Sequence, residues 1–166
     1  WLEIDDNRLR VSDRNGVIEF IDEDVIDLTI IRTQHHAGGR LVAESRDMRL
    51  GLETHEGRST VKLTNRIPLL SADPLDELIE RLCEQLTSRA VTQLARHETV
   101  EGENWRLTRE NLTVRVSRQE STFPVASISA VETIGQEVRI WTEGNPRAVV
   151  RMPLSTRNTW LLPRLL

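Results

Sequence analysis

The feature that most constrains the fold is a similarity of the chain to itself at a distance of 103 residues. Shifting the sequence by that distance aligns residues 1–31 with residues 104–134 without a gap. Eight apolar positions coincide: Leu2 with Trp105, Ile4 with Leu107, Leu9 with Leu112, Val11 with Val114, Phe20 with Phe123, Val25 with Ile128, Leu28 with Val131 and Ile31 with Ile134. An internal similarity of this length predicts two copies of one structural unit.

Apolar and polar residues alternate within each copy, and this pattern predicts strands. In the first copy "LEI" and "RLRVS" flank a polar turn, and in the second "WRLT" and "NLTVRV" do the same. Further strand-like segments follow, "VIEFI", "DVIDLTII", "MRLGLET" and "STVKLT" in the first copy and "STFPV", "SISAVETI", "EVRIWT" and "RAVVRM" in the second. The chain is therefore predicted to be mainly β, in the α+β class.

A helix is predicted to close each copy. In the first, Asp73 fits an N-cap and Pro74 the first helical position. An apolar stripe at helical spacing follows: Leu75, Leu78, Ile79, Leu82, Leu86 and Leu94, with Ala90 and Val91 beside it. We expect a helix over about 73–96, with Cys83 buried in it as a small apolar residue. The second copy has only "TWLLPRLL", which predicts a short or truncated helix.

The boundary between the copies is predicted in "RHETVEGEN" (96–104), which is acidic and has no apolar period. This places a first domain at 1–97, a linker at 98–103 and a second domain at 104–166.

The second copy contains the sequence "WRLTRENLTVRV…STFPVASISAVETI", whose pattern resembles that of a known family. It is similar to bacterial pleckstrin-homology-like (PH-like) domains, with an aromatic residue and "LT" in the first strand and a later "P-x-x-x-I-x-x-V" segment. The matching positions are Trp105, Leu107, Thr108, Leu112, Pro124, Ile128 and Val131. The first copy keeps the apolar skeleton but lacks the Trp, the "LT" and the Pro. The resemblance implies two tandem PH-like β-barrels or sandwiches, each closed by a C-terminal helix, in a family that binds lipid headgroups, peptides and proteins.

The same resemblance implies a candidate anion or lipid site. PH-like domains that bind phosphoinositides gather basic residues from the first two strands, and here those are Arg106, Arg109, Arg115 and Arg118. Guanidinium groups bind phosphate through bidentate, charge-assisted hydrogen bonds. Residues 104–166 contain nine Arg and five acidic residues. An ordinary solvated strand face is the alternative interpretation. The first copy has Glu3, Asp6, Ser12 and Asn15 at the matching places, which argues against a second lipid site.

Two other clusters contain residue types that can bind metals. His35 and His36 are adjacent in "RTQHHAGGRL" but have no companion at ligand spacing, so we expect a polar loop there. The acidic "IDEDVID" (21–27) lacks the spaced ligands and glycine of a calcium loop, so we expect a solvated charge cluster at a sheet edge. No nucleophile, metal-hydrolase or phosphate-loop motif is present. We therefore predict no catalytic residue, no metal and no cofactor, and a protein that is not an enzyme.

The function predicted first is a non-catalytic interaction or scaffolding module of a larger, bacterial intracellular protein, which binds a protein partner or self-associates. The alternatives are peripheral binding to anionic lipid through the Arg-rich hairpin, and a role like that of the double PH-like modules of histone chaperones. A net charge of −4 argues against nucleic acid as a partner, and no small-molecule substrate is indicated. A single cysteine fits a reducing compartment, so a cytoplasmic location is expected, with membrane association through the parent chain as the alternative.

Overall fold

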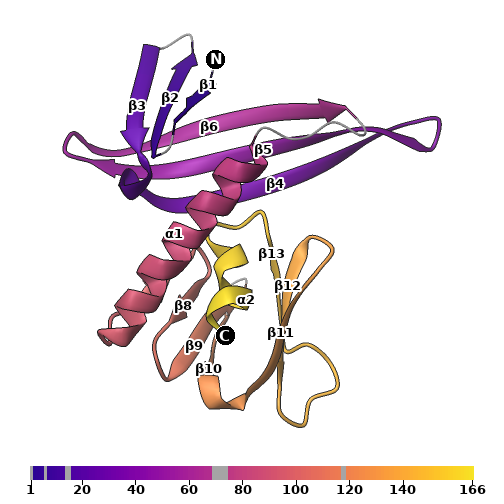
Figure 1. Ribbon diagram of the computed structural model, residues 1–166. Coiled ribbons are helices and arrows are strands. Elements are labelled where there is room, and N and C mark those ends of the chain that lie inside the picture. Colours follow the sequence, from indigo (N-terminus) through magenta and orange to yellow (C-terminus); the bar gives the residue numbers. More distant parts are fainter. Residues whose placement is uncertain (1, 6, 14–15, 69–74, 117–118) are drawn as a thin grey trace. The chain divides into compact units, whose positions relative to one another are not determined.

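The computed structural model describes residues 1–166 except 1, 6, 14–15, 69–74 and 117–118 (Figure 1). The chain divides into two compact units, residues 1–86 and 87–166. The division falls inside the long helix α1 (Asp76–Ala95), ahead of the segment 98–103 for which a linker was expected. The domain limits taken from the sequence stay a prediction.

Unit 1 contains two three-stranded antiparallel sheets, followed by α1 (Figure 1). Sheet A consists of β1 (Leu2–Ile4), β2 (Arg8–Asp13) and β3 (Gly16–Ile21), in that order. A 3₁₀ turn, η1 (Asp22–Asp24), leads into sheet B, which consists of β4 (Val25–Ala37), β5 (Arg40–Thr54) and β6 (Gly57–Pro68).

The core of unit 1 takes one face of each sheet and the apolar stripe of α1. Leu9 and Phe20 lie opposite each other on β2 and β3, and both are buried. Sheet B adds Leu28, Met48, Leu50, Leu52 and Val61, and α1 adds Leu78, Leu82 and Cys83. Cys83 is buried, as its place in the stripe suggested.

Two ion pairs connect α1 to β5 and to η1 in unit 1. Arg46 on β5, a buried residue, pairs with Asp76 at the start of the helix. Arg81 Nε lies 2.7 Å from Asp22 Oδ2. Asp22 is only 7% exposed, so the expectation of a fully solvated acidic cluster was wrong at this residue. The physical reason is Arg81, which compensates the buried carboxylate. The N-cap and Pro predicted at 73–74 lie outside the described residues.

The β4–β5 hairpin is longer than the sequence suggested. The stretch expected to be a polar loop continues as strand, with Ala37 paired to Arg40. Gly38 and Gly39 form the two-residue connection, with φ of 57° and 78°. Positive φ at both positions is the geometry that closes a tight hairpin, and glycine adopts it without strain. His35 lies within this hairpin, with Nε2 3.0 Å from Ser45 Oγ.

Unit 2 also contains two antiparallel sheets. Sheet C has the order β10 (Gln119–Pro124), β9 (Asn111–Val116), β8 (Trp105–Leu107) and β7 (Val100–Glu101). After η2 (Val125–Ser127), sheet D follows with β11 (Ile128–Ile134), β12 (Glu137–Thr142) and β13 (Val150–Pro153). The chain ends in η3 (Thr159–Leu161) and the short helix α2 (Leu162–Leu165). Buried apolar residues include Trp105, Leu107, Leu112, Val114, Val138, Ile140, Leu161 and Leu162.

The first strands of unit 1 and their counterparts in unit 2 are separated by a constant 103 residues. Adding 103 to the bounds of β1, β2, β3 and η1 gives the bounds of β8, β9, β10 and η2. The first residues of β4 and β11 are also 103 apart. Leu9 and Leu112, which this offset matches, are both 0% exposed. The aligned apolar residues therefore occupy the same places in the same elements.

The mainly β fold class is confirmed, with antiparallel pairing throughout the described strands. In the described part of the chain the strands form four separate sheets and no closed barrel.

Candidate functional site

The outer face of sheet C brings several polar side chains together. Trp105, Leu107, Leu112 and Val114 point into unit 2, so their strand neighbours point outward. The strand register places Arg106 beside Thr113, Thr113 beside Thr122, and Arg115 beside Glu120. The hydroxyl groups of Thr113 and Thr122 are 3.1 Å apart, which connects the two strands on this face.

A polar cleft of about 340 Å³ lies on this face. Three arginines and three glutamates line it: Arg106, Arg115, Arg157, Glu101, Glu103 and Glu120. These formal charges cancel. The cleft is therefore a mixed-charge surface and not a basic patch.

Hydrogen bonds join two segments of the cleft that are far apart in sequence, residues 101–103 and residues 157–158. The N–H of Glu103 donates to the carbonyl of Arg157 at 3.3 Å, and the N–H of Arg157 donates to Glu103 Oε2 at 3.4 Å. Asn158 Nδ2 donates to the carbonyl of Glu101 at 3.4 Å. These bonds position Arg157 at the cleft, although it is far from the first hairpin in sequence.

Gly102, one of the residues that line the cleft, lies against a buried tryptophan. Trp105 is 2% exposed, and its indole lies against Gly102. A Cβ atom at residue 102 would overlap the indole ring near Nε1. Glycine at 102 is therefore required for this close approach.

The two arginines of the first hairpin differ in their contacts. Arg106 Nη2 lies 3.2 Å from Glu120 Oε1, and both side chains are 55% exposed. The guanidinium of Arg115 has no ion pair or side-chain hydrogen bond within the described residues, and its backbone N–H donates to the Asn104 carbonyl at 2.8 Å. Arg115 is thus a cation that can accept a new anionic partner without giving up an existing one.

The structure unites only part of the predicted arginine set. Arg106 and Arg115 line the cleft together. Arg109 lies in the turn between β8 and β9 and does not line it. Arg118 lies outside the described residues. Sequence reasoning missed the three glutamates and Arg157. Glu120 could have been found from the hairpin register, whereas Arg157 carries no local signal.

Across the described residues, no group of three or more His, Cys, Asp or Glu side chains is arranged to hold a metal ion. None of the described helices has both the length and the apolar character needed to span a membrane.

Comparison of the chain with protein-family models, with curated proteins and with solved structures gives no match.

Proposed function

We propose that the chain is a non-catalytic interaction module, and that the cleft on the outer face of sheet C binds a protein segment that carries both acidic and basic side chains. The observation that carries the proposal is Arg115, whose guanidinium is without a partner in the described chain and lies beside the Arg106–Glu120 pair. An acidic side chain of the partner would bind Arg115 through charge-assisted hydrogen bonds. Basic side chains would bind Glu101 or Glu103.

The charge balance favours a protein segment over a lipid headgroup. Three carboxylates line the cleft together with three guanidinium groups. A membrane surface rich in phosphate would approach all six, and the carboxylates would repel it. A peptide can instead place opposite charges against both kinds of side chain, which also gives specificity. The histone-chaperone-like alternative gains no support from the cleft, because its three arginines offset its three glutamates and leave no net attraction for a purely basic segment.

A tandem PH-like architecture supports the same function. The offset of 103 residues between β1–β3 and β8–β10 is what two copies of one unit would give. In each unit two antiparallel sheets precede a helix, which fits the general plan of the PH-like family, a family of binding domains. Fold alone does not assign function, so the proposal rests on the cleft.

Selection from a random phage-displayed peptide library on the immobilised chain would test this function. We expect enriched peptides with both acidic and basic residues, and a loss of affinity of about tenfold or more for the Arg115→Glu variant. Arg109→Glu is the matched control, because it makes the same charge change on the same hairpin outside the cleft. Equal loss in both variants, or no enriched peptide, would contradict the proposal.

Sedimentation with anionic vesicles, at low and at physiological salt, separates this function from lipid binding. The mixed-charge cleft predicts little sedimentation at physiological salt, because exposed charges are then screened beyond about 8 Å. Strong sedimentation that Arg115→Glu abolishes and Arg109→Glu does not would assign the cleft to lipid instead.

A further inference from the structure

Exposed apolar side chains concentrate on sheet A. Of the eight large apolar residues found exposed in the described part of the chain, four belong to this sheet: Ile4 at 39%, Val17 at 52%, Ile18 at 41% and Ile21 at 37%. Three of them are on β3, whose sequence is "GVIEFI". A short strand so rich in β-branched and aromatic residues is well suited to pair with another strand.

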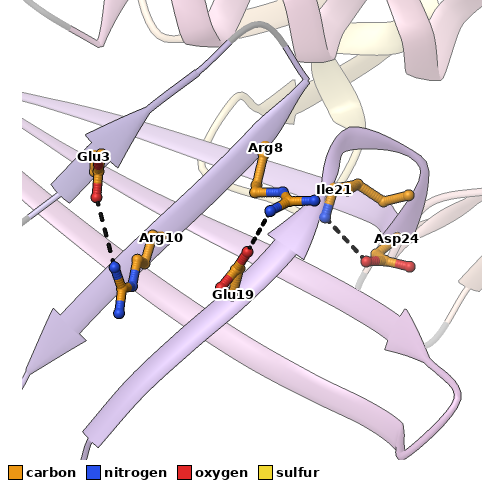
Figure 2. Close-up of polar contacts among 6 residues, drawn as sticks. All are labelled: Glu3, Arg8, Arg10, Glu19, Ile21 and Asp24. Atoms are coloured by element: carbon orange, nitrogen blue, oxygen red, sulfur yellow. Dashed lines mark hydrogen bonds and ion pairs between the residues drawn. The ribbon is translucent and has the colours of Figure 1, made fainter.

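One edge of β3 is open in the described structure. The order of sheet A is β1–β2–β3, so β3 pairs with β2 on one side only (Figure 1). Because the N–H of Asp22 donates to the carbonyl of Asn7 at 3.0 Å, alternation along the ladder directs the N–H and C=O groups of Val17, Glu19 and Ile21 to the open edge. Asp24 Oδ2 accepts the N–H of Ile21 at 3.0 Å, which ends the open edge there (Figure 2).

The equivalent edge in unit 2 is protected. The offset of 103 matches Val17 with Glu120 and Ile21 with Pro124, and it matches Ile18 with Ser121. Charged residues and proline are the usual means of preventing strand addition at an edge. β10 has both and β3 has neither at these positions, so the two edges differ in the property that controls pairing.

We infer that β3 pairs with β3 of a second copy of this chain, antiparallel, about a two-fold axis at Glu19. In this register Val17 lies opposite Ile21 and Ile18 lies opposite Phe20. Residues directly opposite share a face, so the partner strand covers apolar side chains on both faces of the sheet. Val17, Glu19 and Ile21 also meet one another across the axis. The backbone groups available there are the N–H and C=O of Val17 and Glu19 and the C=O of Ile21, because Asp24 accepts the Ile21 N–H.

The one unfavourable pair in this register is Glu19 opposite Glu19, and the structure compensates it. Arg8 Nη1 lies 2.9 Å from Glu19 Oε1, so each copy brings its own counter-charge to the axis (Figure 2). A second copy is the occupant favoured by the sequence of β3 itself, because its apolar residues are placed symmetrically about Glu19. The two-fold axis closes the assembly at a dimer.

This inference concerns a different surface from the cleft, so each can fail without the other. Light scattering coupled to size exclusion, from low to high micromolar concentration, tests it on the full chain. We expect a mass twice the 19.1 kDa of the chain. Val17→Glu, which introduces the residue of β10, should weaken dimerisation at least about tenfold. Val116→Glu is the matched control, because Val116 is exposed to a similar extent, 54%, on β9.

A monomer at the highest concentration would overturn the inference, as would equal dimerisation of Val17→Glu and Val116→Glu. A disulfide test reports on the register without relying on a disruptive variant. In a Cys83→Ser background, Glu19→Cys should give a covalent dimer on oxidation, because opposite residues are within disulfide range. Arg10→Cys, one strand further in, should not. Covalent dimers of both variants, or of neither, would contradict this register.

Discussion

Sheet A and the strands β8–β10 of sheet C have the same element bounds at an offset of 103 residues, yet their surfaces differ. The buried pair Leu9 and Leu112 is identical. On the outer face of sheet A, Arg8 and Arg10 pair with Glu19 and Glu3, at 2.9 and 4.0 Å (Figure 2).

On sheet C, in contrast, the matching places hold residues that leave a cleft with an available cation, Arg115. The edges also differ, because β3 carries Val17 and Ile21 where β10 carries Glu120 and Pro124. The matched strands therefore share a buried leucine, while their exposed residues differ in charge and in the character of the sheet edge.

The largest expected effect tests whether the two sheets have equivalent cores. Leu9→Ala and Leu112→Ala should each lower the free energy of unfolding by about 2–5 kcal/mol, because a fully buried leucine leaves a cavity in either unit. Urea unfolding followed by circular dichroism measures both. Costs that differ by more than about a factor of two would show that the matched positions are not equivalent.

A smaller effect tests an element found only in unit 1, the Asp22–Arg81 ion pair. Val125 is the residue that unit 2 carries at the place of Asp22. Asp22→Val should cost about 1–3 kcal/mol, because it leaves Arg81 without its buried partner. Adding Arg81→Leu should restore part of the loss, since an apolar pair can replace a buried ion pair. No recovery of the urea midpoint in the double variant would indicate that the pair acts by another route.

Two glycines sharpen the comparison further. Gly102→Ala should destabilise unit 2 by about 1–3 kcal/mol, because the new methyl group meets the buried indole of Trp105. Gly51→Ala on β5 meets the carboxyl group of Asp27, a smaller and less buried side chain than the indole, so it should cost less than Gly102→Ala, about 1 kcal/mol. Thermal unfolding of the two variants provides the ranking, and the reverse order would contradict it.

The smallest effect concerns the exposed ion pairs on the two outer faces. Glu19→Gln and Glu120→Gln each remove an ion pair, with Arg8 or with Arg106. Both should change the free energy of unfolding by less than about 1 kcal/mol, and less still at high salt, because solvent screens exposed pairs. Both variants are measured at a concentration at which light scattering gives the monomer mass. A larger, salt-insensitive loss would show that one of these pairs is part of the core structure.

The strands that have one buried face were predictable, because their apolar and polar residues alternate. "RLRVS" and "NLTVRV" place Leu9, Val11, Leu112 and Val114 on one face, and the structure has β2 and β9 there. The stripe of α1 was predictable for the same reason. The outer part of the β4–β5 hairpin was not, because both of its faces are largely exposed and its sequence has no apolar period.

The site was predictable only as far as local register extends. Arg106 and Arg115 share a face because of strand alternation, which the sequence shows. Arg157 joins them through loop contacts, and Asp22 is buried by Arg81, 59 residues away. The open edge of β3 has no local signal either, because exposure depends on whether another element covers the strand.

The division between the units falls within α1, between Leu86 and Thr87. Each unit therefore contains about half of this 20-residue helix. Half of α1 is too short to be a stable helix by itself, since isolated helices shorter than about 12–15 residues are marginal in water. Dividing the gene after residue 86 would leave a frayed half-helix on each fragment, so each unit should be expressed with the whole of α1. The two units thus share a single folding element, and their stabilities are expected to be linked through it.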